Sequence, residues 1–181
     1  MMTEQDTPLR QAMNEGDVRK IIRLIDAGAD VNERGMDGET LLDEAITALE
    51  GHPSLACLVK ELLARGADPR ILNNDGSGPL FAAAIIKDPV IMKMLLEAGA
   101  DPNKEFDAGE ILYQWADFDY RYDEYDLSLP EKPTEAEQTS EDLWLLFLER
   151  LAVKYGKRPP DYLRVLRDYG AKTKREFEEL T

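Results

Sequence analysis

The sequence contains one cysteine, Cys57, and one histidine, His52, among its 181 residues. A single cysteine cannot form an internal disulfide, and these two residues are too few for a cysteine- or histidine-rich metal site. Cys57 lies in the apolar run 55–59, which predicts a small, buried hydrophobic side chain. A lone free thiol suits a reducing compartment, so we expect a cytoplasmic protein.

Motifs that would carry catalysis are also missing. The sequence has no Gly-rich phosphate loop, no zinc-ligand spacing and no Ser/His/Asp or Cys/His set. His52 stands beside a proline in a predicted loop, which favours a surface position. The remaining catalytic candidates are carboxylates, foremost those in 117–126. We therefore expect a protein that is not an enzyme and has no cofactor and no metal. A small hydrolase using loop carboxylates stays open as an alternative.

Positive charge is scarce, because 22 Lys and Arg face 37 Asp and Glu, for a formal net charge of -15. This balance argues against nucleic acid and against anionic membranes, both of which require basic side chains. No apolar run is long enough to span a bilayer, and the acidic N-terminus lacks the features of a signal peptide. The charge is compatible with a basic partner, and equally with a role in solubility alone.

Two short phrases recur along the chain. The first, Gly28-Ala29-Asp30, returns at Gly66 and Gly99 and, in degraded form, at Gly170. It follows an amphipathic apolar run each time, as a left-handed glycine cap does at the end of a helix. The second phrase begins as Thr7-Pro8-Leu9, a good N-cap followed by proline at the first helical position. It places alanines at positions 12, 45, 83 and 116, at spacings of 33, 38 and 33 residues.

A period near 33 with this wording resembles the ankyrin repeat, densely over about 4–103 and with gaps to about 173. The resemblance implies an all-α fold, a solenoid of about four stacked helix-turn-helix units. Each alanine would lie where the two helices of a pair approach closely, and the pairs would stack to bury their apolar faces. We expect a single domain over 1–181, with repeats at about 4–35, 36–73, 74–106 and 107–174.

Two copies of the repeat are interrupted. The second carries five extra residues around 49–53, which predicts a longer turn between its helices. The fourth carries roughly 38 extra residues, and its acidic insertion, about 117–142, has the composition of a mobile loop. Its acids lack the glycine and spaced glutamate of a calcium loop. An apolar helix capped by Ser140 is expected over 143–155, buried on most of its circumference, and a last helix begins at Asp161.

Ankyrin-like proteins typically bind partners with their turn tips and inner helix faces, so the resemblance implies such a face here. Met36, Leu72, Ile85 and Phe106 would be apolar contact anchors, although contact between neighbouring tips explains them equally well. The other predicted positions are polar, except for Phe81. They are Arg34, Asp37, Glu39, Asp43, Asn74, Asp75, Phe81, Glu105 and Asp107, with Thr47, Ser77, Glu110 and Gln114 beside them.

Aromatic residues alternate with acids at the start of the insertion, where Phe118, Asp119, Tyr120 and Tyr122 are further predicted contacts. Rings that merely cover the interrupted repeat are the competing interpretation. Together these features predict a protein-interaction module that binds another, basic protein, as a monomer or weak dimer. An inhibitor or immunity protein is one specific hypothesis. A structural protein that self-associates through the helix over 143–155 is a further alternative.

Overall fold

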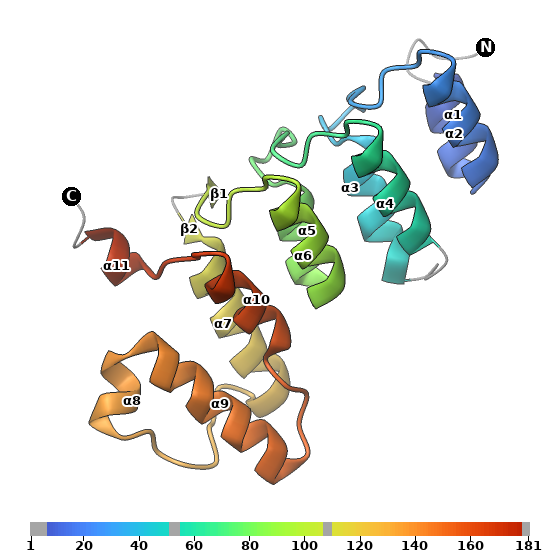
Figure 1. Ribbon diagram of the computed structural model, residues 1–181. Coiled ribbons are helices and arrows are strands. Elements are labelled where there is room, and N and C mark those ends of the chain that lie inside the picture. Colours follow the sequence, from blue (N-terminus) through green and yellow to red (C-terminus); the bar gives the residue numbers. More distant parts are fainter. Residues whose placement is uncertain (1–6, 51–54, 107–109, 179–181) are drawn as a thin grey trace. The chain divides into compact units, whose positions relative to one another are not determined.

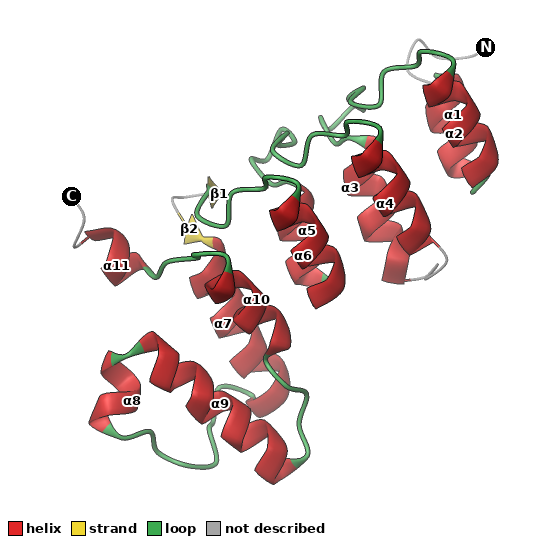
Figure 2. Ribbon diagram, in the orientation of Figure 1, coloured by secondary structure: helices red, strands yellow, loops and turns green. Residues whose placement is uncertain are grey.

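The computed structural model describes residues 7–50, 55–106 and 110–178 (Figure 1; Figure 2). Its regular elements in these residues are helices, apart from one pair of two-residue strands. The all-α ankyrin-type fold predicted from the sequence is confirmed. The chain divides into two compact units, 1–101 and 102–181. The prediction that the whole chain forms one domain stays a prediction. Among the described residues, no helix has the length and apolarity that crossing a membrane requires.

Unit 1 consists of three helix pairs. Within each pair the two helices pack together, and α3 also contacts α1 and α5 while α4 contacts α6, so the pairs are stacked in chain order (Figure 1). The first helices of the pairs are α1 (Pro8–Asn14), α3 (Leu41–Thr47) and α5 (Pro79–Ile85). The second helices are α2 (Val18–Asp26), α4 (Ala56–Ala64) and α6 (Pro89–Glu97), and the 3₁₀ turn η1 (Ala48–Glu50) follows α3.

The repeated residues occupy equivalent settings. Ala12, Ala45 and Ala83 are each fully buried, as helices in close contact require. Gly28, Gly66 and Gly99 end the second helices with φ of +101°, +90° and +99°, a conformation that favours glycine. The side chains of Thr7 and Thr40 accept hydrogen bonds from the amides of Arg10 and Asp43, which caps α1 and α3. The sequence repeat therefore reflects a repeat of structure.

Unit 2 holds a fourth helix pair with an insertion inside it. Strands β1 (Glu105–Phe106) and β2 (Glu110–Ile111) form an antiparallel hairpin before α7 (Leu112–Tyr125). Helix α7 packs against α10 (Asp161–Asp168), and Ala116 on α7 is fully buried. In the sequence between α7 and α10 come α8 (Glu135–Thr139) and α9 (Glu141–Tyr155), which pack on each other (Figure 2). The short α11 (Lys174–Glu178) follows α10.

A shared hydrogen-bond pattern identifies α10 as the end of a true fourth repeat. In unit 1, the side-chain Nδ2 of Asn32 donates to the Gly66 carbonyl at 3.1 Å. Its Oδ1 accepts a hydrogen bond from the backbone amide of Asp68 at 2.8 Å. In unit 2, Asn103 makes the same two bonds, to Gly170 at 2.9 Å and from Lys172 at 2.8 Å. The degraded phrase at Gly170 thus keeps the geometry of the intact copies.

Two expectations about the chain need correction. Cys57 is exposed, because α4 turns its neighbours Leu58, Val59 and Leu62 inward instead. The insertion does not begin as a loop at 117, since α7 continues to Tyr125 and the extra elements lie between Asp126 and Pro160. Tyr113, Ala116 and Tyr120 form a buried stripe at helical spacing along α7, which the alternation of acids and aromatics in the sequence hides.

The predicted start of α9 is confirmed, whereas the prediction that most of its circumference is buried is wrong. Ser140 caps the helix by accepting a hydrogen bond from the amide of Leu143, and α10 begins at Asp161 as expected. Leu145, Phe147, Leu148 and Leu151 are buried on one face. The opposite face is open to solvent, where Leu146 and Val153 are 52% and 84% exposed. Helix α9 is therefore an amphipathic surface helix.

Candidate functional site

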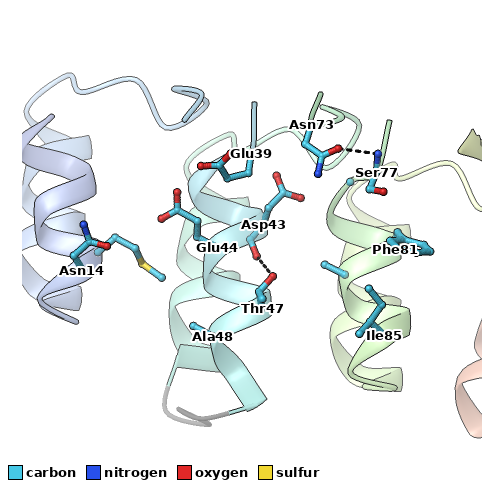
Figure 3. A pocket seen from close by; sticks show the side chains of 13 residues that line it. Asn14, Glu39, Asp43, Glu44, Thr47, Ala48, Asn73, Ser77, Phe81 and Ile85 are labelled. Atoms are coloured by element: carbon cyan, nitrogen blue, oxygen red, sulfur yellow. Dashed lines mark hydrogen bonds between the residues drawn. The ribbon is translucent and has the colours of Figure 1, made fainter. Parts of the chain in front are cut away.

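Unit 1 contains a groove of about 630 Å³. Its walls come from the C-terminal end of α1, from α3 and the turn before it, and from α5 and the turn before it. Figure 3 shows the side chains of α3 lying between Asn14 of α1 on one side and Phe81 and Ile85 of α5 on the other. The lining residues are Met13, Asn14, Glu39, Asp43, Glu44, Thr47, Ala48, Asn73, Ser77, Gly78, Phe81, Ala82 and Ile85.

The groove carries negative charge over an apolar floor. Glu39, Asp43 and Glu44 line it, and none of the described lining residues is basic. Ile85 is 52% exposed, which leaves a large apolar side chain in contact with water. A surface of this composition favours a ligand with both positive charge and apolar atoms.

Arg10 neutralises part of this charge from beneath. Its guanidinium forms ion pairs with Glu33 at 3.7 Å and Glu39 at 3.3 Å, and a further ion pair with Glu44. It also donates to the backbone carbonyls of Glu33 and Glu39, and its side chain is only 11% exposed. One cation thus ties the first repeat to the second and faces three carboxylates, so negative charge remains in excess.

The carboxyl groups of the groove are not fully satisfied. Glu39 Oε2 is buried, and among the described residues it has no hydrogen-bond partner. Burial raises the pKa of the Glu44 carboxyl above its ordinary value, and the charge of Arg10 offsets only part of this shift. Both observations describe anionic groups that lack part of their compensating positive charge.

Asp43 is positioned by helix capping. Its Oδ2 accepts hydrogen bonds from the Thr40 amide at 2.8 Å and the Thr40 hydroxyl at 2.7 Å. Burial nevertheless raises the pKa of the Asp43 carboxyl, and the side chain is 8% exposed. The Asp43 carboxylate is thus held at the N-terminus of α3 and lies in the wall of the groove, and its direct contact with a partner stays a prediction.

The turn tips before α3 and α5 are joined to each other. Arg34 Nη2 donates to the Leu72 carbonyl at 2.7 Å, and Asn74 Nδ2 donates to the Met36 carbonyl at 3.2 Å. The Asn74 amide also donates to the Asp37 carbonyl at 2.8 Å. These bonds use backbone atoms, so the Met36 side chain stays free and is 72% exposed. The tips of unit 1 therefore form one continuous edge beside the groove.

The structure brings some predicted site residues together and not others. Glu39, Asp43, Thr47, Ser77, Phe81 and Ile85 line the groove, whereas Arg34, Met36, Asp37, Leu72, Asn74 and Asp75 lie at the tips outside its lining. Glu110 and Gln114 belong to unit 2. Asp107 falls outside the described residues, as do the side chains of Glu105 and Phe106.

Sequence reasoning missed several lining residues, including Asn14 and Glu44. A signal for Asn14 was present, because Asn14, Thr47 and Ile85 each stand two residues after a repeat alanine. All three line the groove, so a position known in one repeat locates its equivalents in the others. Glu44 directly precedes a repeat alanine, as Ala82 does, and both line the groove, but no predicted site residue held this position.

The aromatic cluster on α7 divides between surface and core. Phe118 and Tyr122 are 51% and 56% exposed, and their rings stack with centroids 6.5 Å apart. Tyr120 is 1% exposed, and its hydroxyl donates to the Arg158 carbonyl at 2.7 Å. The prediction of Tyr120 as a partner contact is therefore corrected, since its ring covers the fourth helix pair. Asp119 follows Phe118 on the same helix and precedes Tyr122, and its side chain is half-buried.

Metal chemistry finds no support in side-chain placement. Within 7–50, 55–106 and 110–178, no three His, Cys, Asp or Glu side chains gather as a metal site would require.

Comparison with known proteins gives two matches. The family model for the ankyrin repeat matches residues 75–105, which span α5, α6 and the turns around them. A protein of Bos taurus named inactive serine/threonine-protein kinase TEX14 is 33% identical over 111 residues. This similarity covers 61% of the present chain and 7% of that much longer protein.

Proposed function

Because the chain is an ankyrin-repeat protein, and such repeats generally mediate protein–protein interaction, we propose that it binds a basic segment of a partner protein in the groove of unit 1. The observation that carries the proposal is the groove lining, in which Glu39, Asp43 and Glu44 stand beside the exposed Ile85. Lysine and arginine side chains combine a cationic end with an apolar stem, and such a stem suits the floor provided by α5.

The carboxylates of the groove are the reason for proposing a positively charged partner. A cation beside Glu39 Oε2 would supply the missing hydrogen bond, and one beside Glu44 would return its pKa toward the ordinary value. An ion pair inside a concave surface is stronger than one on a flat surface, because less water screens the two charges. An acidic partner would meet like charge in the same place.

The exposed Phe118–Tyr122 pair on α7 supplies a second candidate contact in unit 2. Stacked, solvent-exposed rings resemble the aromatic anchors found at interaction hot spots. With acids around them, they suit a basic partner as well. We include in the proposal an inhibitory role, in which carboxylates of this chain occupy the site where a basic enzyme binds phosphates.

The test compares two apolar positions of one repeat. Ile85→Asp places a charge at the floor of the groove, and Val90→Asp places the same charge on α6, at a residue that is 65% exposed and does not line the groove. Proteins captured with the native chain from the source organism are identified, and the candidate is purified. Its affinity, measured by calorimetry, should fall at least tenfold for Ile85→Asp and change little for Val90→Asp.

Two outcomes would contradict the proposal. Equal binding by both variants would remove the groove from the interaction. A purified partner with an acidic binding segment would leave the groove as a possible contact but overturn the basic partner.

A further inference from the structure

Unit 2 contains a separate cavity of about 390 Å³, which the groove of unit 1 does not involve. It lies where α7, the start of α9 and the segment leading into α11 come together. Tyr113, Asp117 and Arg121 of α7 contribute to it, with Glu141 and Trp144 of α9 and Lys174 of α11. The inserted helices are thus needed to form it.

One wall of the cavity is held in place by a closed set of interactions. Asp117 Oδ1 accepts a hydrogen bond from Trp144 Nε1 at 2.7 Å, and Asp117 Oδ2 pairs with Arg121 Nη2 at 2.8 Å. The Arg121 guanidinium carbon lies 5.8 Å from the centroid of the Trp144 ring. Because Asp117 and Arg121 satisfy each other, they fix the indole ring and leave little charge for a ligand.

Two other groups in the cavity lack partners. Tyr113 is 1% exposed, and its buried hydroxyl has no hydrogen-bond partner among the described residues. Among the described residues, the half-buried Glu141 carboxylate forms no hydrogen bond and no ion pair. A buried polar group without a partner costs free energy in the folded state, so the Tyr113 hydroxyl beside the half-buried Glu141 carboxylate requires an explanation.

The basic side chains near Glu141 bond to other groups, although Arg175 also lines the cavity and the Arg167 guanidinium carbon lies 5.5 Å from the centroid of the Tyr113 ring. Arg175 Nη2 donates to the Thr139 carbonyl at 2.8 Å, and Arg167 pairs with Glu176 at 2.7 Å. Lys174 is exposed at the rim. Burial raises the pKa of Glu141, and the negative charge of Asp117 raises it further. The positive charges of Arg167 and Arg175 offset only part of this rise. The cavity therefore offers one carboxylate that forms no ion pair among the described residues, one hydroxyl without a described partner, and aromatic walls.

We propose that this cavity binds a guanidinium group, held by the Glu141 carboxylate and the Tyr113 hydroxyl against the Trp144 ring. A guanidinium is planar and carries five N–H donors, so it can bond a carboxylate with two parallel hydrogen bonds and a hydroxyl oxygen with another. Its faces stack on aromatic rings, which suits the wall that Asp117 and Arg121 hold. The group can belong to an arginine of a partner protein or to a small guanidino compound.

The experiment follows the indole N–H of Trp144 in ¹H–¹⁵N spectra of the full chain. The chain has two tryptophans, so a Trp115→Phe variant assigns the Trp144 signal. The probe is N-acetylarginine N-methylamide, which has no free carboxylate, and the uncharged citrulline analogue is its control. We expect saturable movement of the Trp144 signal with the arginine probe, with Kd on the order of 1 mM for a single side chain, and none with the citrulline probe.

Matched variants test the two unpartnered groups. Glu141→Gln should weaken binding at least tenfold, and Tyr113→Phe should weaken it several-fold in a chain whose circular dichroism is unchanged. Glu135→Gln removes an exposed acid of α8 outside the cavity and should leave the titration unchanged. Equal movement with the citrulline probe, or an unaltered titration in Glu141→Gln, would overturn the proposal.

A second probe separates the two sources of the guanidinium. The same arginine placed within a neutral pentapeptide should bind more tightly than the single residue if a protein partner supplies it, and equally if the natural ligand is a small compound. In either case, the Glu141→Gln variant should bind the peptide more weakly than the native chain. The groove variant Ile85→Asp should leave both titrations unchanged, so this site and the function proposed for unit 1 can fail independently.

Discussion

At the scale of single residues, Thr40 and Asp43 show one carboxyl group serving two purposes. The carboxylate caps α3 and at the same time forms part of the acidic wall of the groove. Its 8% exposure separates it from water, and the hydrogen bonds from Thr40 only partly compensate. Capping therefore holds a charge in a place where burial opposes it.

This conflict predicts a pH dependence of stability. Because burial raises the pKa of Asp43 above its unfolded value of 3.8, its contribution is most favourable below that value and declines as pH rises through the folded pKa. Asp43→Asn keeps an oxygen acceptor but cannot ionise. The variant should thus gain stability relative to the native chain between about pH 4 and about pH 7.

Urea unfolding at both pH values gives the measurement. Asp75→Asn, at an exposed tip, is the control for loss of one charge from a chain with a formal net charge of -15. The prediction concerns the difference between the two variants. A difference that moves in the opposite direction, toward the native chain as pH rises, would show that the hydrogen bonds to the ionised carboxylate outweigh its burial.

At the scale of helices and strands, the sequence predicts most where a residue type has one physical use. Glycine at +φ and alanine between helices are demanded by geometry, so their recurrence located the helix ends and the close contacts correctly. The extension of α7 was missed because Tyr120 and Tyr125 are buried aromatics amid acids, and local composition there is that of a loop. The tertiary contact of Tyr120 with Tyr162 on α10, with ring centroids 6.3 Å apart, is not visible in the local sequence.

The candidate sites likewise include residues that the sequence could place and residues that it could not. Positions repeated from unit to unit, such as Thr47 and Ile85, could be placed on the groove from the sequence alone. The cavity around Glu141 could not, because it depends on how the inserted α9 lies against α7. The exposure of Cys57 escaped prediction for a related reason: a run of five apolar residues does not say which of them faces outward on a helix.

The buried alanines make a prediction about helix contacts. Ala45 lies in α3, which contacts α4, α1 and α5, and it is fully buried. A leucine there has no space, and overfilling such a contact costs about 1–3 kcal/mol. Ala56→Leu, at an exposed position of the neighbouring α4, adds the same atoms and should change stability by less than about 0.5 kcal/mol. Chemical unfolding of both variants gives the comparison.

Equal stability of the two variants would mean that the alanine positions are not points of close approach. That result would contradict the stacked arrangement that the repeat spacing predicts. A loss for both variants would instead point to an effect of leucine on helix formation, which the high helix propensity of leucine makes unexpected.

At the scale of the whole molecule, the positions of the two tryptophans distinguish the two compact units. Trp115 and Trp144 both lie in unit 2, whereas the helices that give the circular dichroism signal are spread over both units. Tryptophan fluorescence thus reports unit 2, and circular dichroism reports the entire chain. Repeat proteins transmit stability from one repeat to the next through neighbouring contacts, so a change at one end is felt along a coupled array.

The prediction that residues 1–181 form a single domain can be tested with this difference. If the chain unfolds as one array, Ala45→Leu in unit 1 should lower the fluorescence and circular dichroism midpoints together. For a chain of this size, each kcal/mol lost at the midpoint corresponds to about 2–4 °C. The native chain should likewise give coincident transitions with both probes. A variant in which the dichroism transition moves and the fluorescence transition stays would show that unit 2 folds independently, and the cavity at Glu141 would then belong to a separate domain.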